Sequence, residues 1–151
     1  MKTRDIILIT CYFLYTSMFL YAAVYKLLNF HIFFLQMKSQ PFDERVTPLL
    51  VYGIPIVEIC ASIMMLTIRF RKTGMYLSTA LMTCFTIYII IIKLNFFDKI
   101  PCSCGGVISS FTWTQHLFFN LFYLFIGGIA IYLEQSPKEQ PSLWHSTYSN
   151  K

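Results

Sequence analysis

Apolar residues in this chain are gathered into four long runs, each separated from the next by a short polar or charged stretch. A helix that spans a membrane needs about 20 consecutive apolar residues, and charge-free runs of that length occur at 6–25 and 73–92. The four expected helices cover residues 6–28, 48–68, 73–93 and 113–133. The pattern therefore predicts an all-α fold, an integral membrane four-helix bundle.

The composition agrees with a membrane protein and excludes several other classes. Of the 151 residues, 56% are apolar and only 13% are charged, about half the charged fraction of a soluble domain. That balance argues against a soluble globule, a disordered chain and a secreted disulfide scaffold. We expect one domain over residues 1–133, with no room for a second. The polar stretch 134–151 lacks helical periodicity and is expected to form a disordered cytoplasmic tail.

Basic residues predict how the bundle is oriented and what it contacts. The densest cluster, Arg69, Arg71 and Lys72, lies between the second and third runs, and such clusters favour the cytoplasmic side. Four helices then place both termini in the cytoplasm and the 29–47 and 94–112 loops outside, in a multi-pass protein of the bacterial cytoplasmic (inner) membrane. The net charge of +5 forms no basic stripe, so we expect contact with the lipid bilayer and none with nucleic acid.

Two cysteines in the 94–112 loop are the strongest indication of chemistry. Cys102 and Cys104 are separated by one residue and followed by Gly105 and Gly106, in a loop expected to face an oxidising compartment. A disulfide between such close neighbours departs from relaxed geometry, and strained, exposed disulfides are easier to reduce. The glycines permit positive φ and close approach of a partner chain. The pair is therefore a candidate for catalytic thiol–disulfide exchange.

Other interpretations of the cysteines stay open. Cys102 and Cys104 could be free thiols, or could bind a soft metal such as Cu(I) if His116 or a methionine completed the ligand set. The other three cysteines lie within apolar runs, where we expect small buried hydrophobic residues. These are Cys11, Cys60 and Cys84.

Glu58 is the one acidic residue inside a predicted span. It lies about 15 Å along the helix from Pro48, and a carboxylate at such depth costs a few kcal/mol unless it faces a partner or a cavity. Lys26 is the nearest candidate partner. The two residues form either a structural ion pair or a site that handles protons or orients a redox cofactor. His116, near the start of the fourth helix, either supports the cysteines by lowering a thiol pKa or shuttling protons, or is an ordinary interfacial residue.

Several short motifs follow one another in a characteristic order along residues 6–133. They are Lys26-Leu27, Pro55-x-x-Glu58, Phe85, Cys102-x-Cys104-Gly105, Trp113 and Asn120. In this order they resemble the methylamine-utilisation MauE family and its DoxX-like relatives, which are small bacterial membrane proteins with four helices.

The resemblance implies a redox-associated role. Members of the MauE family are thought to help form or transport the disulfide-rich small subunit of methylamine dehydrogenase in the periplasm. By position, Cys102 and Cys104 match the paired cysteines of the family, and Glu58 matches its intramembrane acid. A thioredoxin-like protein or an exported cysteine-containing client is the implied partner. If electrons leave the protein, a membrane quinone is the expected acceptor, because no metal-binding set is visible in the sequence. The 29–47 loop contains no cysteine, so the second cysteine pair that relays electrons in quinone-coupled disulfide oxidases is missing from it.

Three hypotheses of function follow. The first is a membrane thiol–disulfide exchange factor that assists maturation of exported proteins through the Cys102-x-Cys104 loop, with Glu58 and Lys26 shaping the site. The second is a non-enzymatic scaffold or chaperone for a redox partner. The third is a small metal or solute carrier, which a stoichiometric Cu(I) complex would favour.

Overall fold

The computed structural model describes residues 3–40, 43–94 and 112–136, and within them the chain is entirely helical. The helices are α1 (Thr3–Leu28), α2 (Phe30–Lys38), α3 (Thr47–Leu66), α4 (Arg71–Lys93) and α5 (Trp113–Gln135). All except α2 are long and apolar enough to cross a membrane. The predicted all-α bundle with four membrane-spanning helices is confirmed.

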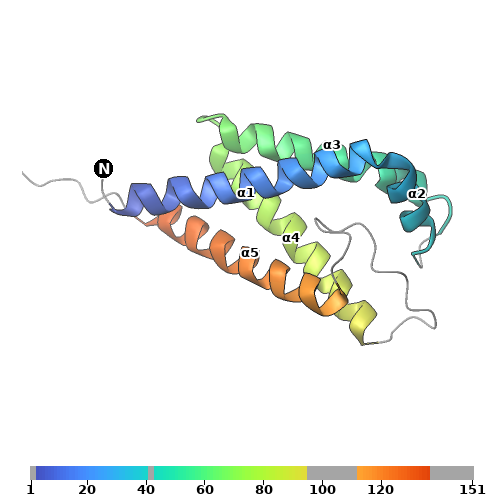
Figure 1. Ribbon diagram of the computed structural model, residues 1–151. Helices are drawn as coiled ribbons and strands as arrows, with labels where there is room; N and C mark the ends of the chain where they lie inside the picture. The colour runs from blue at the N-terminus through green and yellow to red at the C-terminus, as the bar shows by residue number, and fades with distance from the viewer. Residues whose placement is uncertain (1–2, 41–42, 95–111, 137–151) are drawn as a thin grey trace, which may run out of the picture.

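The long helices form two pairs that cross one another. Helix α1 packs mainly against α3, and α4 packs mainly against α5. Figure 1 shows that α3 and α4 meet at the short turn that joins them and separate toward the end that carries α2. We call this the α2 end of the bundle, and the opposite end, where Arg4 of α1 meets Leu133 of α5, the Arg4 end. The separation leaves room between the helix pairs at the α2 end.

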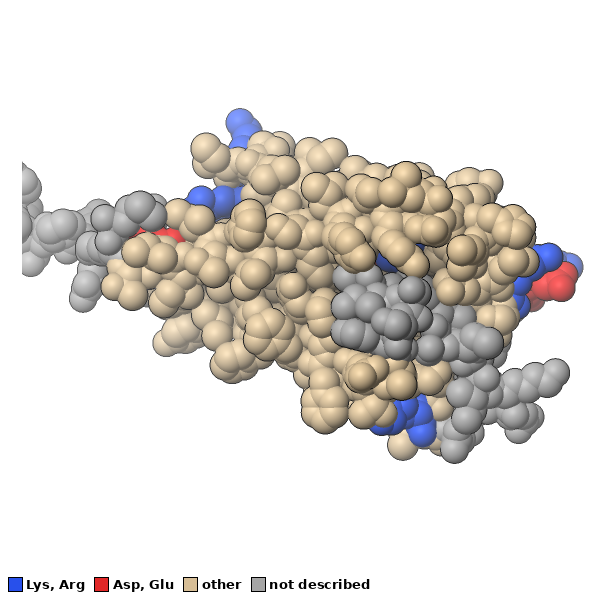
Figure 2. All heavy atoms as spheres, in the orientation of Figure 1, with Lys and Arg blue, Asp and Glu red and all other residues tan. Residues whose placement is uncertain are grey.

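The outer surface of the bundle is that of a protein solvated by lipid. Phe13, Leu66, Phe118 and Phe125 are each about 70% exposed. Figure 2 shows the visible charged side chains gathered toward the two ends of the elongated molecule, with a largely uncharged band between them. Apolar helices close all their backbone hydrogen bonds internally, as a bilayer requires. The chain is therefore a multi-pass membrane protein.

A glycine brings α5 close to α1 and α4. A Cβ atom built on Gly127 would collide with the Tyr15 hydroxyl and lie 2.7 Å from Thr79 Oγ1. Tyr15 is fully buried, and its hydroxyl donates a hydrogen bond of 2.6 Å to the Tyr123 carbonyl. Small residues allow this approach, and tight packing of this kind is what holds helices together in lipid.

The Arg4 end is closed by a polar cluster around Glu134. Its carboxylate lies 2.9 Å from Lys72 Nζ and 3.6 Å from the Arg71 guanidinium, and it accepts a hydrogen bond of 3.1 Å from the Tyr12 hydroxyl. The prediction that a disordered tail begins at 134 is therefore wrong at its start. Helix α5 continues to Gln135 because the cluster gives Glu134 partners; residues 137–151 lie outside the described part of the chain.

Helix α2 occupies part of the segment that the sequence pattern predicted as a 29–47 loop. Its inward face packs Phe33 and Met37 against Val51 of α3. Together with Phe30 and Phe34, these side chains follow the i, i+3, i+4, i+7 spacing of one helical face. Burial of this face explains why a short segment is helical rather than extended.

The boundaries of α3 and α5 follow from local chemistry. Helix α3 begins at Thr47, with Pro48 in its first turn, and continues through Pro55 to Leu66. Helix α5 begins one residue after Thr112, whose side chain accepts from the Gln115 backbone while the Gln115 side chain accepts from the Thr112 backbone. This capping box fixes the start of α5 at Trp113.

Candidate functional site

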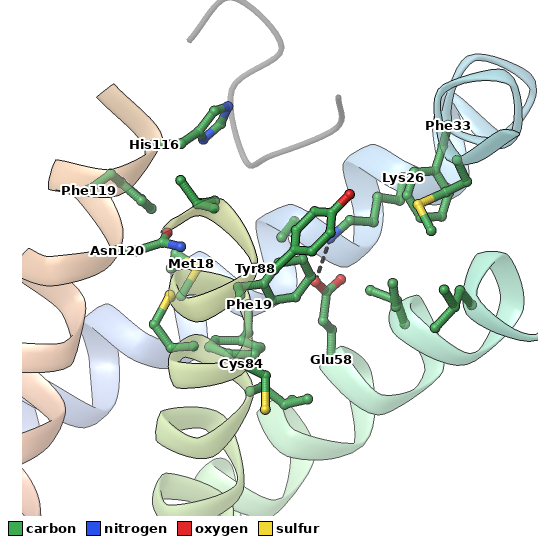
Figure 3. Close-up of a pocket in the computed structure, with 18 of the residues that line it drawn as sticks. Met18, Phe19, Lys26, Phe33, Glu58, Cys84, Tyr88, His116, Phe119 and Asn120 are labelled. Atoms are coloured by element: carbon green, nitrogen blue, oxygen red, sulfur yellow. Dashed lines mark hydrogen bonds and ion pairs between the residues drawn. The ribbon is translucent and has the colours of Figure 1, made fainter. Parts of the chain in front are cut away.

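A pocket of about 320 Å³ lies in the α2 end of the bundle. All five helices contribute to its walls, through residues that include Phe19, Phe33, Ile54, Tyr88 and Phe119. Figure 3 shows these walls, with the aromatic rings of α1, α2, α4 and α5 around the space. The volume falls in the range of small-molecule sites, about 300–1,000 Å³.

The pocket contains a buried ion pair between α1 and α3. The Lys26 ammonium donates directly to Glu58 Oε1 (Figure 3), and the two residues are only 5% and 4% exposed. The pair that the sequence suggested is therefore formed. Both residues continue buried helix faces, because Lys26 follows Ala22 by four positions and Glu58 follows Pro55 by three.

One oxygen of this pair is left without a partner. Glu58 Oε2 is buried and accepts no hydrogen bond from any residue that the structure describes. The lysine ammonium also lies 5.9 Å from the centre of the Phe33 ring, in a cation–π arrangement. In a medium of low dielectric an unsatisfied carboxylate oxygen is costly. The pair therefore presents a strong hydrogen-bond acceptor to the pocket beside a strong donor.

A second polar contact crosses the pocket and was not anticipated from the sequence. The Tyr88 hydroxyl of α4 donates to Oε1 of Gln40, which is buried just after α2. Both side chains line the pocket. No sequence signal connects two residues so far apart in the chain, since Gln40 falls in a predicted loop and Tyr88 in a predicted apolar span.

Helix α5 contributes His116 and Asn120 to the same pocket. The two residues are one helical turn apart, and both are buried. Figure 3 shows them on the α5 wall, at the other side of the space from Lys26 and Glu58. The structure thus brings together three residues singled out from the sequence, namely Lys26, Glu58 and His116, around one pocket.

The ends of α4 and α5 are joined at the margin of this pocket. Lys93 Nζ donates a hydrogen bond of 2.9 Å to Thr114 Oγ1, and Ile89 and Trp113, close to these two residues, line the pocket. The segment 95–111 connects the two helix ends. Cys102, Cys104, Gly105 and Gly106 belong to this segment and lie outside the described residues.

The three remaining cysteines differ in their environments. Cys11 is buried, as expected, whereas Cys60 and Cys84 are exposed on the helix surface. The expectation of burial is wrong for these two, because Cys60 lies on an exposed face of α3 and Cys84 is accessible where it lines the pocket. Within residues 3–40, 43–94 and 112–136, no three His, Cys, Asp or Glu side chains are grouped to hold a metal ion.

Comparison with known proteins gives one family. The family model described as methylamine utilisation protein MauE matches residues 4–133, a range that contains every residue lining the pocket. No curated protein and no solved structure was found to match the chain.

Proposed function

Because the chain belongs to the MauE family, we propose that this multi-pass membrane protein supports thiol–disulfide exchange during maturation of exported proteins. The reacting groups in this proposal are Cys102 and Cys104. The family description connects its members with methylamine utilisation, whereas the proposal for this chain concerns the exchange chemistry and leaves its client open.

The observation that carries the proposal is the geometry at the two ends of the segment that bears the cysteines. The Lys93–Thr114 hydrogen bond joins those ends at the margin of the pocket that contains the Lys26–Glu58 pair. The cysteine segment thus begins and ends next to a largely apolar pocket that contains a buried ion pair. Ionisable side chains within a membrane are expensive, and they commonly mark functional sites.

The exchange itself needs only thiols and disulfides. A client thiolate attacks one sulfur of a Cys102–Cys104 disulfide, which breaks that bond, forms a mixed disulfide and releases the other cysteine as a thiolate. The second client thiolate then attacks the mixed disulfide, and the client leaves oxidised. Two electrons and two protons pass from the client to the pair. The disulfide of a thioredoxin-like partner restores the pair by the same exchange.

The proposal places the α2 end outside the cell's cytoplasmic membrane and both termini in the cytoplasm. Arg69, Arg71 and Lys72 lie at the Arg4 end, and clusters of this kind favour the cytoplasmic side. The cysteine segment then faces the compartment in which disulfides persist.

Lys26, Glu58 and His116 are positioning residues in this proposal. The ion pair ties α1 to α3 in the pocket that the ends of the cysteine segment border, and His116 lies in the first turn of the helix that follows this segment. Their contribution is to hold those ends in place. Replacing them should change the rate of exchange without abolishing the cysteine chemistry.

Mixed-disulfide trapping tests the proposal. In Cys102→Ser or Cys104→Ser protein, the remaining thiolate can attack the disulfide of the thioredoxin-like partner or of an oxidised client, and no second cysteine is left to resolve the mixed disulfide. One of the two variants should therefore accumulate a reductant-sensitive adduct in cells. Cys60→Ser and the double Cys102→Ser/Cys104→Ser variant are the matched controls, and neither should accumulate it. Absence of an adduct from both single variants would contradict exchange.

The scaffold and the metal-carrier hypotheses each predict a different experimental result. If the double serine variant fully supports maturation of client proteins, the chain is a non-enzymatic scaffold and the exchange proposal fails. If the purified protein holds one equivalent of Cu(I) against a chelating competitor, and loses it in the double variant, a metal carrier is indicated instead.

A further inference from the structure

The pocket adjoins the face of the bundle that meets lipid. A second hollow of about 250 Å³ lies between α3 and α4 and shares Ile54, Glu58 and Phe85 with the pocket. Its outer margin includes Leu49, which is 72% exposed, and Gly53, where a Cβ would have no atom within 4 Å. Apart from Glu58, every residue that lines this hollow is apolar. A ligand that reaches the pocket by this route must therefore be lipophilic.

The polar groups at the inner end of this route define the head of the ligand. Glu58 Oε2 is buried without a hydrogen-bond partner among the described residues. A ligand that contacts this oxygen should therefore offer an O–H or N–H donor. The Lys26 ammonium has three N–H donors, of which one goes to Glu58 Oε1. A ligand oxygen next to this pair can donate to the carboxylate as a hydroxyl, or accept from the ammonium as a carbonyl.

The walls of the pocket define the shape of that head. Aromatic side chains reach it from four helices, as Figure 3 shows for Phe19, Phe33, Tyr88 and Phe119. Phe85 and Trp113 add two more rings. Aromatic rings pack well against a flat ring, in stacked or edge-on contacts. Asn120, on the α5 wall, carries both an amide donor and an amide acceptor.

We infer that the pocket binds a membrane quinol or quinone. Its ring lies among the aromatic side chains, one of its oxygens meets the Lys26–Glu58 pair, and its isoprenoid tail leaves between α3 and α4. The quinol hydroxyl donates to Glu58 Oε2, and the quinone carbonyl accepts from Lys26 Nζ. A fatty acid or phospholipid fits less well, because it lacks a flat ring for the aromatic walls, and the carboxylate of a fatty acid would also lie beside that of Glu58. The inference goes beyond the proposed exchange and requires neither Cys102 nor Cys104.

Tryptophan fluorescence tests this binding directly. Trp113 lines the pocket, and Trp144→Phe leaves it as the one tryptophan of the chain. The full-length protein, in nanodiscs of phosphatidylethanolamine and phosphatidylglycerol, is titrated with decylubiquinone, with its quinol, and with a short-chain menaquinone. Saturable quenching is expected, and it should persist in the Cys102→Ser/Cys104→Ser variant. Loss of quenching in that variant would overturn the assignment to the pocket.

Two glycines provide a matched pair of variants. Gly53→Phe places a ring in the hollow between α3 and α4, whereas Gly128→Phe places the same ring at another position with open space around it, on α5. We expect Gly53→Phe to raise the dissociation constant about tenfold or more, and Gly128→Phe to change it by less than about twofold. Equal quenching in both variants would show partition into lipid only and would overturn the inference.

Glu58→Gln distinguishes the two redox states of the ligand. Removing the charged acceptor should weaken quinol binding about tenfold and quinone binding less, because the quinone uses the lysine. Equal weakening of both would contradict the assigned contacts; if this variant does not fold, the glycine pair alone decides. Sodium oleate at equal concentration should not displace the quinone, and displacement would overturn the choice of a quinone over a simple lipid.

Discussion

At the scale of single residues, the central feature is a charged pair buried where charges are least favoured. Lys26 and Glu58 are almost fully enclosed, and each would be expensive alone because the surrounding helices and lipid cannot solvate it. The contact between them offsets part of this cost. Pairs of this kind contribute little net stability compared with apolar residues of similar volume, but removing one partner is strongly destabilising because the other charge is left buried and unpaired.

Lys26→Met should therefore lower the free energy of unfolding by about 3–5 kcal/mol, because it leaves the Glu58 carboxylate buried and uncompensated. The double variant Lys26→Met/Glu58→Leu should regain most of this loss. Unfolding by SDS titration, followed by circular dichroism in mixed micelles, measures both. Lys93→Met is the control, since Lys93 is exposed. A double variant as unstable as Lys26→Met would contradict the ion-pair account.

At the scale of helices, small residues decide how closely neighbouring helices approach. Gly127 lies against Tyr15 and Thr79 with no space for a Cβ, while the adjacent Gly128 has nothing within 4 Å. The two positions have the same residue type and neighbouring places in one helix, yet only one is in the interface. Substitutions at these two positions therefore separate the effect of helix packing from the low intrinsic helix propensity of glycine.

Gly127→Ala should lower the free energy of unfolding by about 1–3 kcal/mol, because α5 must move away from Tyr15 or force it out of position. Gly128→Ala should be neutral or stabilising by up to about 1 kcal/mol, as expected when alanine replaces glycine in a helix. The same SDS titration compares them. Similar effects at both positions would show that the α1–α5 contact is not as close as described.

The Glu134 cluster is expected to stabilise the Arg4 end. Glu134→Gln should cost about 1–2 kcal/mol, because it removes the charge that Lys72 and Arg71 approach while it keeps the shape of the side chain. Lys72 is largely exposed, so part of this difference should disappear in high salt. Unfolding of the wild-type protein and of Glu134→Gln at low and at high salt concentration checks this expectation. A difference in stability between the two proteins that grows with salt would be inconsistent with the cluster.

The sequence predicted the long helices well and the short one poorly, for physical reasons. Runs of about 20 apolar residues have few alternatives to spanning a membrane, so all four spans were found. Helix α2 has nine residues, and its pattern of Phe30, Phe33, Phe34 and Met37 is also compatible with a loop until a partner face on α3 is known. Glu134 was assigned to a tail because its partners lie on other helices.

The candidate site was predictable only in part. A carboxylate in a span requires a partner, so Glu58 pointed to Lys26 before the structure was known. The Gln40–Tyr88 contact joins two elements whose separation in the chain hides their proximity. The pocket itself depends on how far α3 and α4 separate, which no local pattern encodes.

At the scale of the whole molecule, the basic residues near the helix ends bear on orientation. The dense group of Arg69, Arg71 and Lys72 lies at the Arg4 end, and clusters of this kind favour the cytoplasmic side. Lys26 at the α2 end and Arg71 and Lys72 at the Arg4 end are all paired with carboxylates, so ion pairing does not distinguish the two ends. A cytoplasmic Arg4 end therefore stays a prediction from the basic cluster.

A reporter fused to the C-terminus tests this orientation. Green fluorescent protein, which does not fluoresce when exported unfolded, should be bright there, and alkaline phosphatase, which needs an oxidising compartment, should be inactive. Fusions placed after residue 40 provide the opposite control. An active phosphatase at the C-terminus would reverse the topology and place the cysteine segment in the cytoplasm.

The most direct test of the account is thiol labelling in intact cells with a membrane-impermeant maleimide, before and after treatment with a reductant. We predict no labelling before reduction and, after it, one label on Cys102 and one on Cys104. Cys11, Cys60 and Cys84 should stay unlabelled under both conditions, because they lie within the membrane-spanning helices. Labelling of the pair without reductant, or no labelling under either condition, would contradict an outward-facing, redox-active pair.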